Sequence, residues 1–264
     1  MSNIDFEAYK KYFYISKGEP QEEAIDSVSG LQLLDKETMQ RFLDRYSVHI
    51  KAKEQTAAAA YFAGWWGFVA FGLQYAMSVY HTAPRFTLDA ITVRTIQENG
   101  YVRFLFHVDD WKEEAAPADP AERRQWMERV LSEFYRDQLS PLYQVMSGVS
   151  GLDAGQHWGQ LPTKFNYYMG MLKETITDEN VKLQLDEDYL FLKNLDPSVF
   201  GRAKNPLDVK VRWIEDMKSP DKQVRIKNAC CLYYQTGEGE YCYTCPRLKE
   251  EERAAKRVKA RASS

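Results

Sequence analysis

Hydrophobic residues recur at helical spacing in several parts of the chain. Between residues 36 and 53, for example, Met39, Phe42, Leu43 and Tyr46 fall on one face of a helix. The same kind of spacing predicts further helices at residues 6–16, 120–139, 186–195 and 208–217, and one starting near Pro162. Residues 148–159, which are rich in glycine, should form a loop or helix break. The pattern predicts a mainly helical body.

A different pattern occupies residues 86–108. From Val102 to Val108, valine and phenylalanine occupy every second position, which is typical of a strand. The preceding run, 86–96, is rich in Thr, Ile and Val. Asn99-Gly100 lies between the two runs and suits the positive φ angles of a tight turn. We therefore expect an antiparallel hairpin.

Residues 57–84 carry no formally charged side chain and are numerous enough for a helix to cross a membrane. Their composition is nevertheless unlike that of a membrane span. Ala, Gly and aromatic residues dominate, and Trp65-Trp66 sits in the middle, whereas spans have aliphatic centres with Trp at the interfaces. We expect no membrane span here but a buried central helix that packs through its small residues.

Composition and charge narrow the class of protein. Of the 264 residues 44% are hydrophobic and 14% aromatic, enough to form a sizeable core. The formal net charge of −3 argues against nucleic-acid binding, which needs a strongly basic surface. Residues 1–19 hold no apolar signal segment. We expect a cytoplasmic protein, with peripheral contact to the inner membrane as an option.

The chain holds four cysteines, and all of them lie within sixteen residues: Cys230, Cys231, Cys242 and Cys245. In a reducing compartment such a group indicates metal binding or redox chemistry rather than structural disulfides. Four thiolates suit zinc or an iron–sulfur cluster. Only Cys242-Tyr-Thr-Cys245 has the form of a zinc knuckle, and adjacent cysteines chelate a single ion awkwardly. The spacing favours a cluster, with zinc and thiol-redox chemistry as alternatives.

The sequence around these cysteines resembles a known family. Asn228-Ala-Cys-Cys-Leu-Tyr-Tyr, a ten-residue spacer between the cysteine pairs and Tyr-Cys-Tyr-Thr-Cys-Pro are similar to the C-terminal signature of FhuF-like ferric-siderophore reductases. The resemblance covers roughly residues 225–247. It implies that Cys230, Cys231, Cys242 and Cys245 ligate a [2Fe-2S] cluster, and that the chain is an oxidoreductase reducing chelated Fe(III). A zinc-stabilised binding protein and an iron–sulfur sensor or electron carrier remain open.

The implied substrate is a ferric siderophore of hydroxamate or citrate-hydroxamate type, which releases iron more easily once the metal is reduced. No dinucleotide fingerprint is recognisable, so we expect a separate electron donor such as a ferredoxin or flavodoxin. An anionic chelate favours basic and aromatic contacts. Our candidates are Arg202, Lys204, Lys210 and Arg212, which precede the cysteines, and His157 with Trp158 in the Gly-rich break.

Together these patterns predict an α+β protein with a mainly helical body, a small antiparallel sheet and a C-terminal iron–sulfur module. We place a substrate-binding body at residues 1–224 and the module at 225–264. Residues 246–264 hold seven Lys or Arg and three Glu, a local charge of +4. This end should form a solvated, partly frayed helix, or a docking surface for the electron donor.

Overall fold

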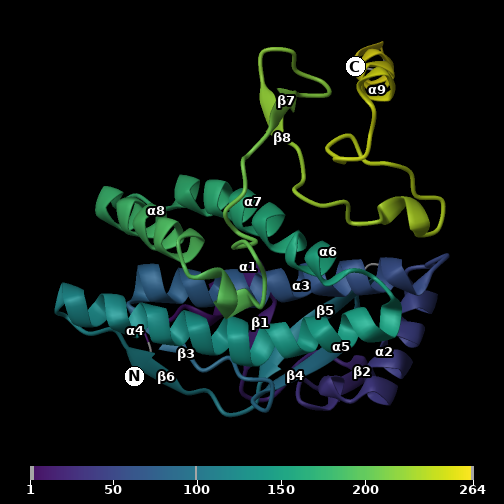
Figure 1. The fold of residues 1–264 in the computed structure, drawn as a ribbon. Helices are drawn as coiled ribbons and strands as arrows, with labels where there is room; N and C mark the ends of the chain where they lie inside the picture. The colour runs from purple at the N-terminus through teal and green to yellow at the C-terminus, as the bar shows by residue number, and fades with distance from the viewer. Residues whose placement is uncertain (1–2, 99, 263–264) are drawn as a thin grey trace.

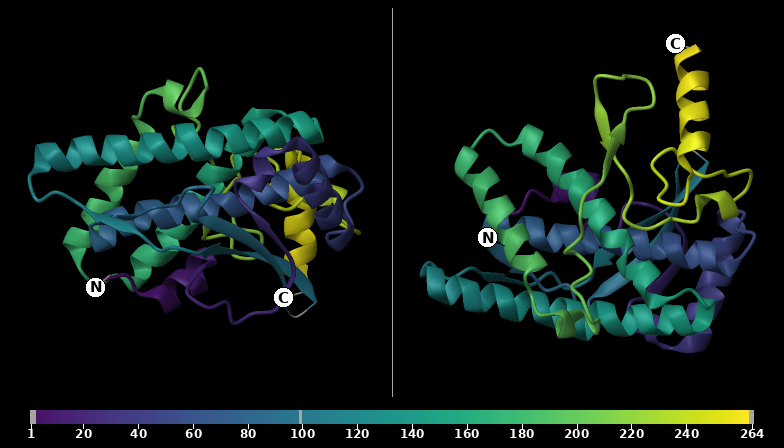
Figure 2. Two further views of the ribbon diagram at one scale, coloured as in Figure 1. Left: turned by 90° about the horizontal axis from the view of Figure 1, so that it is seen from below. Right: turned by 45° about the horizontal axis from the view of Figure 1, so that its top comes forward.

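The computed structural model describes residues 3–98 and 100–262 and is mainly helical (Figure 1). A long helix, α3 (Gln55–Tyr75), runs through the middle of the body and continues as the π-helix η2 (Ala76–Tyr80). The other α-helices of the described residues are α1 (Phe6–Phe13), α2 (Lys36–His49), α4 (Pro120–Ser132), α5 (Ser140–Ser150), α6 (Ala154–Trp158), α7 (Gln160–Thr175), α8 (Glu179–Lys193) and α9 (Glu250–Ala262). A π-helix, η3 (Glu133–Leu139), joins α4 to α5 in one long rod (Figure 2).

The main sheet has the strand order β1-β5-β4-β2. Strands β4 (Ile91–Glu98) and β5 (Tyr101–Val108) form the predicted antiparallel hairpin, and Gly100 adopts a φ of +79° at its turn. Asn99 lies outside the described residues. Strand β1 (Ile15–Lys17) runs parallel to β5, and β2 (Ala24–Ser29) runs antiparallel to β4. Two smaller pairs are β3 (Thr82–Pro84) with β6 (Glu113–Ala115) and β7 (Trp213–Glu215) with β8 (Gln223–Arg225). The predicted α+β class is confirmed.

Helix α3 forms the centre of the core. Its alanines are buried, and its aromatic side chains interlock with those of the hairpin and of α7. The ring centres of Phe62 and Phe104 lie 5.1 Å apart, and those of Phe71 and Phe165 also lie 5.1 Å apart. Both pairs meet edge to face. By length and composition Gln55–Tyr80 could cross a membrane, yet 83% of its most apolar window is buried inside the protein. The segment is the core helix that its composition predicts.

Some predicted elements are wrong. Helix α1 ends at Phe13 because Tyr14 turns left-handed, with a φ of +57°, and the chain then enters β1. Residues 208–217 form an extended arm and strand β7 rather than a helix. Trp213 pairs with Arg225 of β8, and this cross-strand contact overrides the local helical pattern. Helix α6 also occupies part of the break predicted at residues 148–159.

The last part of the chain packs on one end of α3. Cys230, Cys245, Leu232 and Leu248 form a small hydrophobic cluster with alanines at the start of that helix. The β7–β8 hairpin projects from the body near α7, and α9 stands beside it (Figures 1 and 2). The cysteine segment is therefore held between the core helix and two projecting elements.

Candidate metal centre and adjoining cavity

The first pair of cysteines is buried. Cys230 and Cys245 are 4% and 1% exposed, and their Sγ atoms lie 3.5 Å apart. Burial raises the pKa of the Cys230 thiol to about 11. The main-chain amides of Leu232 and Arg247 each lie 3.4 Å from a sulfur of this pair and donate to it. These N–H···S contacts would stabilise the sulfurs as thiolates once a metal compensates their burial.

The second pair, Cys231 and Cys242, is half-buried and lies beside a cation. The Cys242 thiol donates to Cys231, and Lys227 Nζ lies 3.3 Å from Cys231 Sγ. These two neighbours lower the pKa of Cys231 to about 5, while the shared hydrogen bond raises the pKa of Cys242. Burial alone would lower the pKa of Lys227, but the nearby sulfurs, Cys231 before Cys242, outweigh it and hold this pKa above its usual value. Cys231 is thus prepared as a thiolate at neutral pH.

Tight local geometry brings the two pairs together. Leu232 adopts a φ of +59° directly after Cys231, which turns the chain sharply. Gly239, in the segment between Cys231 and Cys242, packs so closely that a Cβ there would lie 2.0 Å from the carbonyl oxygen of Tyr233. From the body, the Gln156 and Gln160 side chains donate to the carbonyl oxygen of Cys230. Helices α6 and α7 therefore fix the position of the first pair.

The four thiols form a donor set that a two-iron cluster can use. They approach each other as two pairs, Cys230 with Cys245 and Cys231 with Cys242. A structural zinc ion needs four ligands around one centre. A two-iron cluster accepts thiolates at two separate irons, which suits two pairs.

Residues 228–247 match the family model of the FhuF 2Fe-2S C-terminal domain. The cysteine segment is therefore similar to this iron–sulfur domain. The resemblance read from the sequence is confirmed, and the cofactor of the domain is a [2Fe-2S] cluster. No curated protein matches the chain. The similarity covers the segment that carries all four cysteines and identifies it as iron–sulfur binding.

A cavity of about 1110 Å³ adjoins the domain. Its walls come from α3, α7, the tip of the β4–β5 hairpin and the chain from Val209 to Asn228, including the β7–β8 hairpin. Cys231 and Lys227 also line it. One cysteine of the second pair therefore faces a space large enough for a drug-sized ligand.

The cavity is basic and aromatic. Its basic side chains are Arg103, Lys164, Lys210, Arg212, Arg225 and Lys227, against the single acidic side chain of Glu174 among the described lining residues. Burial and the nearby Lys227 charge lower the pKa of Lys164 to about 8, and its ammonium lies 3.9 Å from the Phe68 ring centre. Large rings stay exposed at the rim, with Tyr101, Tyr167 and Trp213 at 73%, 64% and 49%. Such a wall suits a bulky anionic ligand.

The structure separates the residues predicted to contact substrate. Lys210 and Arg212 line the cavity, as a substrate role requires. Arg202 and Lys204 are exposed on the turn after the 3₁₀-helix η4 (Pro197–Phe200), outside the cavity lining. His157 and Trp158 are 0% and 2% exposed and pack inside the helical core. We correct the expectation for this pair, because a buried side chain offers no surface to a chelate.

His157 instead predicts a pH dependence of folding stability. Neither ring nitrogen has a hydrogen-bond partner among the described residues, and burial lowers its pKa from 6.5 to about 4. The unfolded chain therefore binds an extra proton between these values, and the free energy of unfolding should fall by about 3 kcal/mol as the pH drops from 6.5 to 4. Denaturant unfolding at several pH values between 4 and 6.5 measures how steeply the free energy of unfolding depends on pH. His157→Leu should make this dependence weaker, and an equal dependence in both proteins would contradict the role of His157.

Several cavity residues were missed from the sequence. Lys227 stands three positions before Cys230, and its place in the motif could have marked it. Arg225 and Trp213 could have been paired as neighbours only after the β7–β8 hairpin was recognised. Lys164 carries no such signal, because its charge lies on a helix whose pattern reads as an ordinary amphipathic one.

Proposed function

We propose that this chain is a ferric-siderophore reductase in which Cys230, Cys231, Cys242 and Cys245 hold the [2Fe-2S] cluster and the adjoining cavity binds the chelate. The observation that supports this most strongly is the position of Cys231. Its thiol pairs with Cys242 in the cluster segment, and its side chain also lines the cavity. A chelate in the cavity would therefore lie next to a cluster ligand, with no chain segment between them.

The residues of the cavity have clear tasks in such a reaction. When bound, a [2Fe-2S] cluster supplies one electron, the number that converts Fe(III) to Fe(II). Basic side chains from the arm and from α7 attract the negative chelate, and rings such as Trp65 and Trp213 provide apolar contact. Because Fe(II) is bound more weakly than Fe(III) by hard oxygen ligands, reduction loosens the iron.

The partners follow from the same chemistry. The substrate would be a ferric siderophore of hydroxamate or citrate-hydroxamate type. The electron would come from a separate one-electron protein donor of the ferredoxin or flavodoxin kind. We further propose that the protein works in the cytoplasm, free or peripherally at the inner membrane. Residues 1–224 would provide most of the cavity, and residues 225–264 the cluster and the wall around Lys227.

Charge reversal at two neighbouring lysines tests the cavity. Lys210→Glu replaces an exposed lining cation by an anion. We expect it to weaken binding of an anionic ferric chelate about tenfold, since the charge beside the bound chelate changes by two units and the chelate itself displaces water between them. Lys204→Glu makes the same change six positions earlier, outside the cavity lining, and should leave the dissociation constant within about twofold. Quenching of tryptophan fluorescence by the ferric chelate measures both, because Trp65 and Trp213 line the cavity.

The comparison controls for net charge and for residue type. Equal weakening in both variants would show a non-specific charge effect and would contradict binding in this cavity. Unchanged binding in both would contradict it as well.

A further inference from the structure

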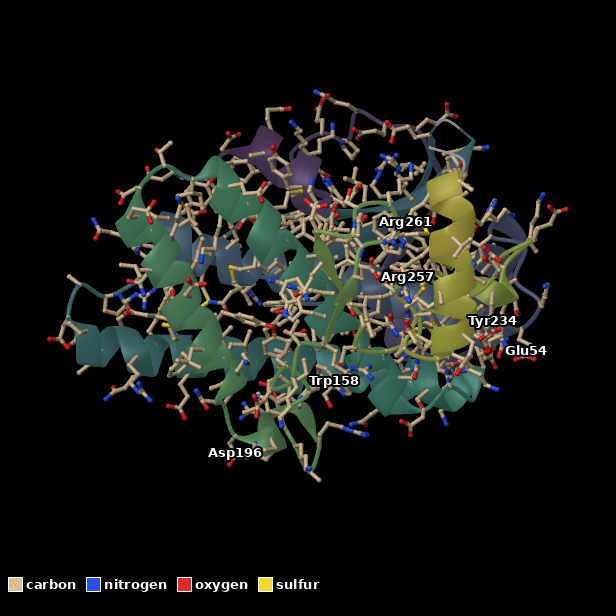
Figure 3. All side chains as sticks on the ribbon, turned by 90° about the horizontal axis from the view of Figure 1, so that it is seen from above. Glu54, Trp158, Asp196, Tyr234, Arg257 and Arg261 are labelled. Carbon is tan, nitrogen blue, oxygen red and sulfur yellow. The ribbon has the colours of Figure 1, made fainter. Side chains whose placement is uncertain are left out.

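Three arginines of α9 share one face of that helix. Arg253, Arg257 and Arg261 follow each other at intervals of four residues, which places them in a row. Figure 3 shows Arg257 and Arg261 on the side of α9 that faces the β7–β8 hairpin. The charge of this end, read from the sequence as a solvated helix or a docking surface, is thus largely engaged within the chain.

Arg253 binds the loop that carries the last two cysteines. It is 5% exposed, and its guanidinium donates to the carbonyl oxygens of Tyr243 at 3.1 Å, Cys245 at 3.0 Å and Leu248 at 3.2 Å. Glu250 pairs with the same guanidinium at 2.8 Å. One buried side chain therefore satisfies three main-chain acceptors around Cys245, and the planar fork of arginine is suited to this task.

The other two arginines reach the β7–β8 hairpin. Arg257 donates to the Tyr243 hydroxyl at 3.2 Å, and that hydroxyl donates to the carbonyl oxygen of Glu215 in β7 at 2.5 Å. Arg261 binds the Glu215 carboxylate at 2.7 Å and the carbonyl oxygen of Asp216 at 3.0 Å. Both strands of this hairpin contribute residues that line the cavity, including Trp213 and Arg225.

We propose that α9 is a clasp that joins the cluster loop to one wall of the cavity. Arg253 is a positioning residue for Cys242 and Cys245, and Arg257 with Arg261 holds the hairpin against the same loop through Tyr243 and Glu215. The part of this inference that concerns the cavity wall rests on the proposed function, whereas the part that concerns Arg253 rests only on the cofactor.

The physical reason lies in what each arginine would leave behind. Without the Arg253 fork, the carbonyls of Tyr243 and Leu248 lose their side-chain donor, while that of Cys245 keeps the Leu248 amide, and the loop must open for water to replace the guanidinium. In an opened loop, a competing chelator can reach the irons of the cluster. Without Arg257 and Arg261, the loop keeps its own contacts but the hairpin loses its tether.

The experiment follows cluster loss from the assembled full-length protein. Excess EDTA is added anaerobically, and the decay of the visible absorption is recorded for wild type, Arg253→Met, Arg253→Lys and Lys256→Met. Loss should be about tenfold or more faster in Arg253→Met and intermediate in Arg253→Lys, which keeps the charge but not the fork. Lys256→Met removes the same charge from α9. Its ammonium pairs with the exposed Glu240 carboxylate and, among the described residues, binds no main-chain carbonyl of the cluster loop, so this variant should match wild type.

Equal rates in wild type and Arg253→Met would overturn the proposal, and so would equal acceleration in Lys256→Met. If Arg253→Met takes up no cluster, the rate of cluster loss from Arg253→Lys is compared with that from wild type. A ratio of these rates near one overturns the proposal. The melting temperature of each variant separates loop opening from general unfolding, because the body should melt as in wild type.

A second arm tests the tether to the cavity wall. The double variant Arg257→Met/Arg261→Met should keep its cluster yet show about tenfold faster amide exchange at residues 213–225. Unchanged exchange there would overturn this part. Failure of the wild type to bind any ferric chelate would contradict the proposed function, whereas the ranking of cluster-loss rates would still support or overturn the role of Arg253.

Discussion

Replacing Cys245 by serine is expected to abolish stable cluster binding. Cys245 is the most buried of the four cysteines, and its sulfur lies 3.5 Å from that of Cys230 inside a small apolar cluster. A serine hydroxyl is a harder and less acidic ligand than a thiol, and it would have to ionise in this dry surrounding. Iron, acid-labile sulfide and visible absorption after anaerobic reconstitution should all fall about tenfold or more.

The matched control is Lys218→Ser, at an exposed position beyond β7. It introduces the same side chain into a nearby segment and should retain the full cluster content. Wild-type colour and iron content in Cys245→Ser would contradict ligation by all four cysteines.

The second large effect is expected at Lys227, whose ammonium lies 3.3 Å from the sulfur of Cys231. A positive charge and a hydrogen bond at a ligand sulfur stabilise the more negative, reduced state of the centre. A hydrogen bond to a charged group contributes about 1.5–3 kcal/mol. For a one-electron couple this corresponds to a midpoint potential lower by about 60–130 mV in Lys227→Met. Anaerobic redox titration, followed by visible absorption, measures it.

Two variants separate this local effect from the general charge of the cavity. Lys227→Arg keeps the charge and a hydrogen-bond donor, so its midpoint potential should stay close to that of wild type. Lys210→Met removes an exposed cation that lines the same cavity without touching a cysteine, so its potential should stay within about 20 mV of wild type because exposed charges are screened. Equal shifts in Lys227→Met and Lys210→Met would contradict a specific contact with Cys231.

Lys227 also lines the chelate cavity, so one cation lies beside both the cluster segment and the proposed substrate site. An anionic chelate placed near this ammonium would compete with the Cys231 thiolate for its charge. Substrate binding and midpoint potential should therefore be coupled. Lys227→Met should weaken chelate binding and also lower the midpoint potential.

Much of the fold could be predicted because its signals are local. The alternation from Val102 to Val108 identified the β5 strand, and an uncharged segment rich in Ala, Gly and aromatic residues identified the central helix α3. The cysteine spacing, together with its neighbours, identified the cluster segment, because a ligand motif is contiguous in sequence. Each of these features is complete within about twenty-five residues of the chain.

The cavity could not be predicted in the same way, because its walls meet only in the folded chain. Arg103 comes from a strand, Lys164 from α7 and Arg225 from a hairpin whose first strand was read as a helix. Arg202 and Lys204 have the same composition as Lys210 and Arg212, and no sequence pattern separates the pair outside the cavity from the pair that lines it. His157 looked accessible in a Gly-rich break, yet α6 packs it into the core.

The role of α9 shows the same limit. Its three arginines read as surface charge, since helical spacing reveals that they share a face but not what that face meets. Several of their acceptors are main-chain carbonyls, those of the cluster loop and of Asp216 just after β7, and main-chain acceptors leave no trace in the sequence.

The most direct test of the central claim is a single-turnover measurement under anaerobic conditions. The protein is reduced, excess reductant is removed, and a ferric hydroxamate chelate is added while the visible spectrum of the cluster and the capture of Fe(II) by a colorimetric chelator are recorded together. The reduced cluster is expected to reoxidise as the chelate is added, with one Fe(II) released for each electron lost. A cluster that stays reduced in the presence of saturating chelate, with no Fe(II) released, would contradict it.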